Sequence, residues 1–177
     1  IEITKKRARR IAVHASLLTQ SKSRVKKEKG ALHIVDSLGY IQIDTISVIE
    51  RAHHHTLWNR QQDYRHEYLD ILLSKKRQVF EYWGHAASIL LMKDYRFYLP
   101  YMKTCQNPQS GWAKKRKEKC KHTLEDVYSK IIDTGPMGSR DFQPETSVKR
   151  NGWWDWKPAK IALEVLFSEG RLMVSGR

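Results

Sequence analysis

Gln42 and Asp44 are the residues whose types and spacing best suit chemistry, because they alternate with Ile41 and Ile43. Strict alternation of apolar and polar residues indicates a short, half-buried strand. Residues two apart in a strand share a face, about 7 Å apart, so the amide and the carboxylate look outward together while the isoleucines anchor them. Asp44 could accept a proton from a water that Gln42 orients, which suits hydrolysis. The alternative is an ordinary polar strand face turned to solvent.

Three consecutive histidines, His53, His54 and His55, raise the question of a metal site. Successive helical residues point about 100° apart, so three in a row do not converge on one ion, and we expect no metal and no cofactor. Imidazole also donates hydrogen bonds to phosphate. We therefore expect one or two of them, with Arg51 beside them, to contact nucleic acid, and His53 and His54 are our candidates. The remainder would be exposed to solvent.

A second candidate binding segment contains Trp153, Trp154 and Trp156 just before an expected helix. Tryptophan there could stack on bases, with Lys157 and Lys160 on phosphates. Equally, tryptophans at a helix entrance often close a hydrophobic core. We expect Trp153 and Trp154 to face DNA and Trp156 to be buried.

The charge is strongly unbalanced: 33 Lys and Arg stand against 19 Asp and Glu, a formal net charge of +14. The whole excess lies in two segments, residues 5–29 and 114–121, and the rest of the chain is balanced. Two cationic stretches on a neutral body favour a polyanionic partner over general solubility, although such runs are often only solvated faces. Double-stranded DNA is the partner that best fits the charge and the interleaved aromatic residues.

Several classes of protein are disfavoured. The composition, 40% hydrophobic and 29% charged, is that of a globular chain. The longest apolar run, residues 89–92, is far too short for a membrane span, and no secretory segment is visible at the charged beginning. Cys105 and Cys120 are too few for a disulfide scaffold. No phosphate-binding glycine loop and no HExxH pattern is present, so nucleotide-cofactor and zincin chemistry have no support.

Several elements must position the Gln42–Asp44 strand. Residues 3–18 predict a helix capped by Thr4, with one face in the core and one cationic face. A second helix should end at Gly39 in a left-handed cap, directly before the strand. Ser47 and Glu50 form a capping box that predicts a helix over 48–56. Further along we expect a helix over 64–75, a strand over 78–83, and a helix within 90–102 that Pro100 kinks or ends.

Composition also suggests a division of the chain. Residues 105–122, with Pro108, Gly111 and a lysine run, predict an exposed basic linker between a first unit, 1–104, and a second, 123–177. The second unit should contain a helix capped by Thr123 and Asp126 and ended by Gly135, a short helical turn over 139–142, a helix from Pro158 to Gly170, and a strand over 172–174. This order is typical of a winged helix cut short in its wing. We expect a mainly α fold with short β hairpins, built from tandem winged-helix (helix-turn-helix) units.

Residues 38–45 and 50–55 resemble the winged-helix DNA glycosylases of the YcaQ/AlkZ type, which remove alkylated bases and unhook interstrand crosslinks. Residues 80–87, and 153–157 with 162–164, are similar to the same family in order and spacing. The hallmark of the family is Gln, an apolar residue, then Gln or Asp, and here it is Gln42-Ile43-Asp44. Members are longer chains with a C-terminal β-barrel around a DNA channel, so we expect this sequence to correspond to their N-terminal half.

The resemblance implies a bacterial, cytoplasmic, monofunctional DNA glycosylase that acts as a monomer at the nucleoid, without cofactor or obligate protein partner. It implies Gln42 and Asp44 as the catalytic pair and double-stranded DNA with alkylated bases as substrate. The alternative is a non-enzymatic winged-helix DNA-binding protein or transcriptional regulator, which explains the charge and the Trp-Lys segment without chemistry. That alternative leaves unexplained why a strand carries Gln42 and Asp44 beside a histidine-rich helix.

Overall fold

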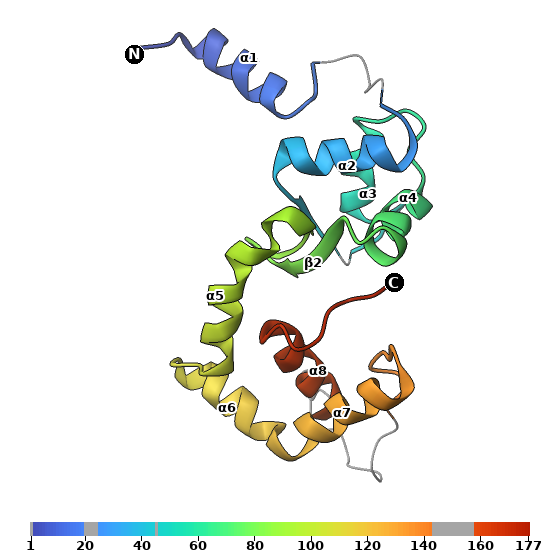
Figure 1. Cartoon of the computed structure of the whole chain (residues 1–177). Helices are drawn as coiled ribbons and strands as arrows, with labels where there is room; N and C mark the ends of the chain where they lie inside the picture. Colours follow the sequence, from blue (N-terminus) through green and yellow to red (C-terminus); the bar gives the residue numbers. More distant parts are fainter. Residues whose placement is uncertain (1, 20–24, 45, 143–157) are drawn as a thin grey trace. The chain divides into compact units, whose positions relative to one another are not determined.

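The computed structural model describes residues 2–19, 25–44, 46–142 and 158–177. It is mainly helical with one three-stranded antiparallel sheet (Figure 1), as the sequence predicts. The chain forms two compact units, one made of Ile1–Arg96 with Val174–Arg177 and the other of Phe97–Met173. No helix in the described ranges is long and apolar enough to cross a membrane.

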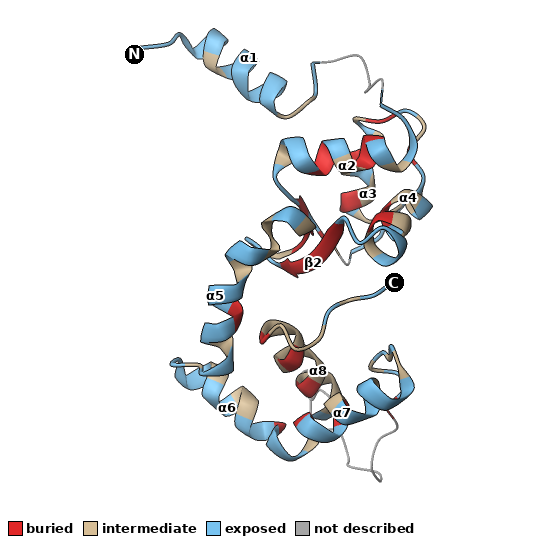
Figure 2. Cartoon of the chain, in the orientation of Figure 1, coloured by how far each residue is buried: buried red, intermediate tan, exposed pale blue. Residues whose placement is uncertain are grey.

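The first helix, α1 (Lys5–Ala15), begins at its predicted cap, where Thr4 Oγ1 accepts the Arg7 N–H at 3.3 Å. The prediction that one face packs in the core is wrong, because α1 has no buried residue (Figure 2). Ile11 is 52% exposed. Apart from Ile11 the predicted stripe within the helix is alanine, and burying a methyl group gains little free energy.

The second helix, α2 (Lys27–Leu38), ends at Gly39 with φ 83°, the left-handed cap that the sequence predicts. Its buried side chains include Ile34 and Val35. Gly30 faces the buried Gln61, and a Cβ built at Gly30 would lie 2.8 Å from Gln61 Oε1. The amide of Gln61 donates to the Lys27 carbonyl at 2.9 Å, so a polar contact ties the start of α2 to the core.

The sheet has the order β1-β3-β2, with β1 (Ile41–Gln42), β2 (Val79–Trp83) and β3 (Ala87–Leu91). β2 and β3 form a hairpin, and β1 pairs with β3 through Ile41 opposite Ile89. The strands predicted at 41–44 and 78–83 are therefore present, the first in shorter form. β3 is absent from the sequence prediction, because its run of apolar residues fits a helix and a buried strand equally well.

The helix predicted over 48–56 begins later, as α3 (Ala52–Trp58). Glu50 makes no capping box with Ser47; its Oε1 accepts the Arg51 N–H at 2.8 Å, and Ser47 pairs with Arg51 in an isolated antiparallel bridge. The helix predicted over 64–75 is present as α4 (His66–Asp70), which continues into a π-helical turn, η1 (Ile71–Lys75).

The core of unit 1 fills the space among α2, α3, α4 and the sheet. Its buried side chains are Ala31, Ile34, Val35, Ile41, Ile43, Leu57, Tyr64, Leu69, Leu72, Val79, Ile89 and Leu91. Both isoleucines of the predicted Gln42–Asp44 strand belong to it. The strand that carries the candidate catalytic residues is thus anchored from below by the core, as its alternation predicts.

A 3-10 turn, η2 (Met92–Asp94), leads into α5 (Tyr95–Gln106). The helix contains Pro100 without ending there, and the Pro100 carbonyl accepts the Thr104 hydroxyl at 3.0 Å. The linker expected over 105–122 is wrong where α6 (Gly111–Lys119) forms, with Ser110 Oγ accepting the Ala113 N–H at 3.2 Å. Lysine is a good helix former, and a serine cap outweighs the loop-like composition.

In unit 2, α7 (Lys121–Thr134) packs on α8 (Pro158–Ser168), around a core that contains Cys120, Val127 and Leu166. Pro158 opens α8 as predicted, and Gly135 and Gly170 follow the two helices with φ of 93° and 70°. Three predicted details are wrong. The helix expected to be capped at Thr123 starts earlier, at Lys121, and residues 139–142 form a turn and a bend instead of helix. Residues 172–174 form no strand, and Leu172 packs on the core instead.

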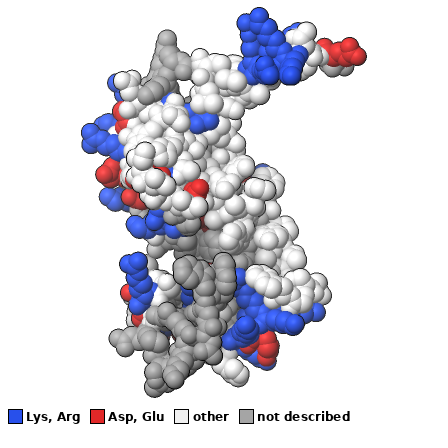
Figure 3. Space-filling view, turned by 180° about the vertical axis from the view of Figure 1, so that it is seen from behind, with Lys and Arg blue, Asp and Glu red and all other residues white. Residues whose placement is uncertain are grey.

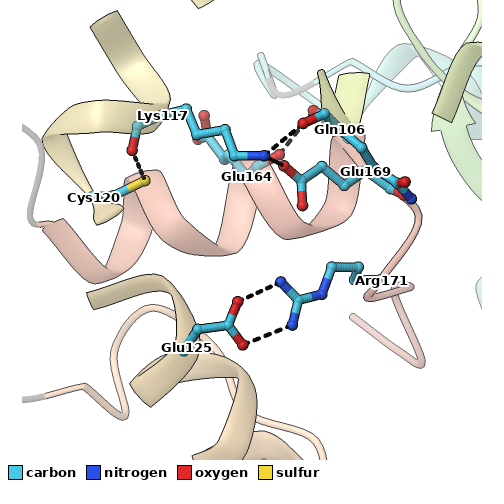
Figure 4. Close-up of polar contacts among 8 residues, drawn as sticks. Gln106, Lys117, Cys120, Glu125, Glu164, Glu169 and Arg171 are labelled. Atoms are coloured by element: carbon cyan, nitrogen blue, oxygen red, sulfur yellow. Dashed lines mark hydrogen bonds and ion pairs between the residues drawn. The ribbon is translucent and has the colours of Figure 1, made fainter. Parts of the chain in front are cut away.

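Ion pairs join α6 and α7 to the end of α8 (Figure 4). Lys117 Nζ contacts the carboxylate of Glu169, which is 3% exposed, and donates to the Gln106 carbonyl at 2.7 Å. Arg171 donates two hydrogen bonds to Glu125, at 2.7 and 2.9 Å, and its guanidinium lies over the Tyr128 ring at 4.1 Å. Part of the basic segment is therefore neutralised within unit 2.

Candidate active site

Gln42 and Asp44 share a face of the strand edge. Ile41 and Ile43 are 2% and 7% exposed, while Gln42 is exposed and Asp44 half-buried. The pairing continues past β1, because the Ile43 N–H donates to the Ala87 carbonyl at 2.7 Å. This register fixes which residues face inward, since a slip by one residue would bury Gln42 and Asp44.

Two hydrogen bonds hold Asp44. Its backbone N–H donates to His53 Nδ1 at 3.4 Å, and its Oδ1 accepts the Ile46 N–H at 2.9 Å, as in an Asx turn. Within the described ranges no donor contacts its other carboxylate oxygen. Asp44 therefore has one oxygen fixed by the backbone and one that a substrate or a water can approach.

His53 is buried, 5% exposed, on the first turn of α3. Since Nδ1 accepts the Asp44 amide hydrogen, the ring proton must sit on Nε2. Burial, and then the positive charges of Arg51 and Arg177, lower the pKa of His53 and keep the ring neutral. In this conformation the ring of His53 contacts the Asp44 backbone, and a contact of His53 with DNA stays a prediction.

His54 belongs to an aromatic cluster. Its ring stacks on His66 with centroids 3.7 Å apart, and its Nδ1 lies 2.8 Å from the Tyr64 hydroxyl, with Trp58 beside them. Burial, and then the neighbouring His53 and His66, lower the pKa of His54 to about 4. A half-buried, neutral imidazole is a poor phosphate ligand, because it carries no positive charge at neutral pH.

A cavity of about 430 Å³ lies against this cluster. Arg51, which precedes α3 and is half-buried, lines it together with Ile43, Glu50, His53, His54 and His66. Glu81, buried in β2, also lines it and accepts two hydrogen bonds from Arg177, at 2.8 and 2.7 Å. Gln42 and Asp44 are not among the lining residues, so the predicted pair lies outside this cavity.

Glu50, His54 and His66 place one potential ligand atom each within 4.8 Å of one another. This set involves only one of the three consecutive histidines, and the spacing of Glu50 and His54 by four residues is the sequence signal that points to it. The rings of His54 and His66 are nearly parallel, 13° apart. Because imidazole lone pairs lie in the ring plane, these nitrogens do not converge unless one ring turns.

The remaining predicted binding residues belong to unit 2. Lys160 lies half-buried on α8. Trp153, Trp154, Trp156 and Lys157 lie outside the described residues. The structure therefore places Asp44 against His53, and Arg51, His53 and His54 around one cavity, and it leaves the Trp-Lys segment as a prediction.

The cations of the two basic segments differ in whether they face solvent or form internal ion pairs. On α1 every Lys and Arg is exposed, and Figure 3 shows these side chains gathered over the helix at the upper right. On α6, Arg116 and Lys117 pair with Glu164 and Glu169. The cationic helix at the start of the chain is thus the more available of the two basic segments.

A family model described as DNA glycosylase AlkZ-like matches residues 35–177, most of the chain. The chain belongs to the AlkZ-like DNA glycosylase family. The matched region begins inside α2 and includes the strand with Gln42 and Asp44, the histidine-rich α3, the sheet and all of unit 2. An AlkZ-like chain is a DNA-repair glycosylase, so DNA is its partner and a glycosyl bond its point of attack. No solved structure matches this chain.

Two features of this AlkZ-like site are missing from the sequence prediction. The first is the contact of His53 with the Asp44 backbone, for which the residues give no local signal, because a turn of irregular structure separates them. The second is the loop between Asp44 and α3. Its aliphatic residues suit an amphipathic helix, but the Asx turn at Asp44 and the bridge of Ser47 with Arg51 hold this segment in another conformation.

Proposed function

We propose that this protein is a monofunctional glycosylase that hydrolyses the N-glycosidic bond of alkylated purines in duplex DNA, with Gln42 and Asp44 as the catalytic pair. The observation that carries the proposal is the geometry of Asp44. Its Oδ1 accepts a backbone N–H, and Gln42 stands on the same face of the strand edge. A carboxylate fixed on a rigid element is what a positioned base requires.

Hydrolysis of the glycosidic bond of an N7-alkylguanine requires few catalytic groups besides a positioned carboxylate. An N7-alkylguanine already carries positive charge, so its departure with the electrons of the C1′–N9 bond needs little acid catalysis. The sugar develops oxocarbenium character, which the anion of Asp44 stabilises. Water then adds to C1′ and gives its proton to Asp44, while Gln42 orients that water or the sugar.

The position of the pair supports large substrates. Gln42 and Asp44 do not line the cavity described above, so a bulky adduct or one arm of an interstrand crosslink would not need to enter it. Most enzymes that act on a base extrude it into such a pocket. We propose that unhooking of crosslinks proceeds at this open strand edge, with cations of α1 on the DNA backbone.

The test is release of N7-methylguanine from a duplex oligonucleotide, read as strand breaks that appear only after alkali. Asp44→Asn keeps the oxygen that accepts the Ile46 N–H but removes the base, so excision should fall by about 10²–10⁴-fold with DNA affinity little changed. Glu67→Gln, exposed on α4, is the matched control. Undiminished excision by Asp44→Asn would refute the assignment, and a sequence-dependent footprint without any abasic sites would indicate a regulator.

A further inference from the structure

An exposed apolar loop directly follows Asp44. Ile46, Val48 and Ile49 are 73%, 92% and 89% exposed, and we call residues 46–49 the apolar loop. Single aliphatic residues on a surface are ordinary, but three within four residues form a local patch of the kind that marks an interaction site. The patch stands between two buried residues, Ile43 and His53.

The loop is built by specific contacts. The Ile46 N–H donates to Asp44 Oδ1, and Ser47 pairs with Arg51 at the other end. The Glu50 carbonyl lies 3.1 Å from His55 Nε2, which ties the end of the loop to α3. The backbone is thus fixed at both ends, while the aliphatic side chains of Ile46, Val48 and Ile49 are exposed to solvent.

The occupant of this patch must lie against the catalytic carboxylate, because the same Asp44 side chain that would face the sugar is bonded to the loop. A protein partner or a second copy seated on the loop would cover Asp44. Duplex DNA would leave Asp44 accessible to the reaction, since a bound duplex brings its bases to the apolar loop and its sugar to the Asp44 carboxylate. Aliphatic side chains are known to enter duplexes as wedges between base steps and to unstack them.

From this placement we propose that Val48 and Ile49 insert into the base stack beside the target nucleotide and, with Ile46, hold the step open. The inference rests on the proposed function and extends it: unstacking next to the lesion would expose C1′ to Asp44 without drawing the modified base into a closed pocket.

The experiment uses duplexes with 2-aminopurine next to the N7-methylguanine, because 2-aminopurine brightens when it unstacks. The Asp44→Asn protein is the reference, since it binds without excising and keeps the loop contact. It should brighten the probe, and adding Val48→Ala and Ile49→Ala should remove most of that signal. In the protein with native Asp44, the same two changes should slow single-turnover excision about tenfold or more. Ile132→Ala, at a 65% exposed position on α7, is the matched control.

The outcomes separate the two proposals. In one outcome the native protein excises no base, yet Asp44→Asn still raises the fluorescence of the probe in a manner that depends on Val48 and Ile49. The wedge, meaning insertion of Val48 and Ile49 into the base stack, is then supported, and the proposed reaction is refuted. If excision is normal and the loop variants excise and brighten like their parents, the wedge is refuted. Sedimentation of the DNA-free protein provides a further arm, because dissociation of a dimer by the loop changes would assign the patch to self-association and overturn the wedge.

Discussion

At the scale of single residues, Asp44 depends on groups that do no chemistry. His53 accepts its backbone hydrogen from a buried, neutral ring, and the apolar loop donates to its carboxylate. The outward position of Gln42 and Asp44 was predictable from their alternation with isoleucine, and their proposed catalytic role came from the resemblance to the glycosylase family. The supporting role of His53 was not predictable, because it arises only when α3 folds back against the strand.

Replacing His53 by Leu should lower kcat for excision about tenfold while KM changes little, because a part-buried backbone donor loses its acceptor and Asp44 loses its orientation. His53→Asn, whose side-chain oxygen can occupy a place near Nδ1, should recover part of the loss. Steady-state kinetics on the N7-methylguanine duplex measure both. Equal loss in the two variants, or a change confined to KM, would contradict a positioning role.

The lowered pKa of His54 predicts a pH dependence of stability. The unfolded ring titrates near 6.5 and the folded one at about 4, so between these values the unfolded state binds more protons. The contribution of the neutral His54 ring to the free energy of unfolding is therefore fully present above pH 6.5 and is lost as pH falls toward 4. Thermal unfolding at a series of pH values should show a smaller acid loss for His54→Gln. His55→Gln, which removes an exposed ring from the same helix, is the control.

At the scale of elements, the sequence predicted those with strong periodicity or a glycine stop, namely α1, α2, the α4 segment, β2 and α8. It failed where local signals compete. Ser47 and Glu50 look like a capping box, but Ser47 pairs with Arg51 in a bridge and the Glu50 carboxylate accepts the Arg51 N–H. The lysine-rich segment looked like a linker, and its ion pairs with Glu164 and Glu169, far along the chain, make it a packed helix.

Gly30 tests how closely α2 packs. A Cβ there would lie 2.4 Å from the Val25 carbonyl oxygen and 2.8 Å from Gln61 Oε1. Gly30→Ala should therefore lower the free energy of unfolding by about 1–3 kcal/mol, although alanine favours helices. Gly111→Ala, where nothing lies within 4 Å, should be neutral or stabilising. Urea denaturation measures both, and a stabilised Gly30→Ala would contradict the packing described.

At the scale of the whole molecule, charge divides into cations that face solvent and cations that hold unit 2 together. The sequence located the excess but could not tell these uses apart, because the ion-pair partners Glu164 and Glu169, on α8 and directly after it, are about fifty positions away. We therefore expect α1 to supply most of the electrostatic contacts with the DNA backbone, whereas some cations of α6 stabilise unit 2 through ion pairs.

Salt dependence should reveal this division. Replacing Lys5, Lys6, Arg9 and Arg10 with Ala should reduce the slope of log K against log salt by about 0.9 for each phosphate that the protein then leaves unneutralised. Helix formation is not at risk, since α1 buries no residue and alanine favours helices. Lys93→Ala, where the lysine pairs with Asp36, is the control. Fluorescence anisotropy with an undamaged duplex gives the slopes, and an unchanged slope would exclude α1 from DNA contact.

The buried thiol of Cys120 is a natural reporter of the opening of unit 2. Its thiol is inaccessible and burial raises its pKa, whereas Cys105 is half-buried. A thiol reagent reaches such a sulfur only when the unit opens, because the reactive thiolate must first meet solvent. The slow phase of labelling would therefore report the rate at which unit 2 opens within the intact chain, without any introduced reporter group. DNA that stabilises this unit should slow that phase.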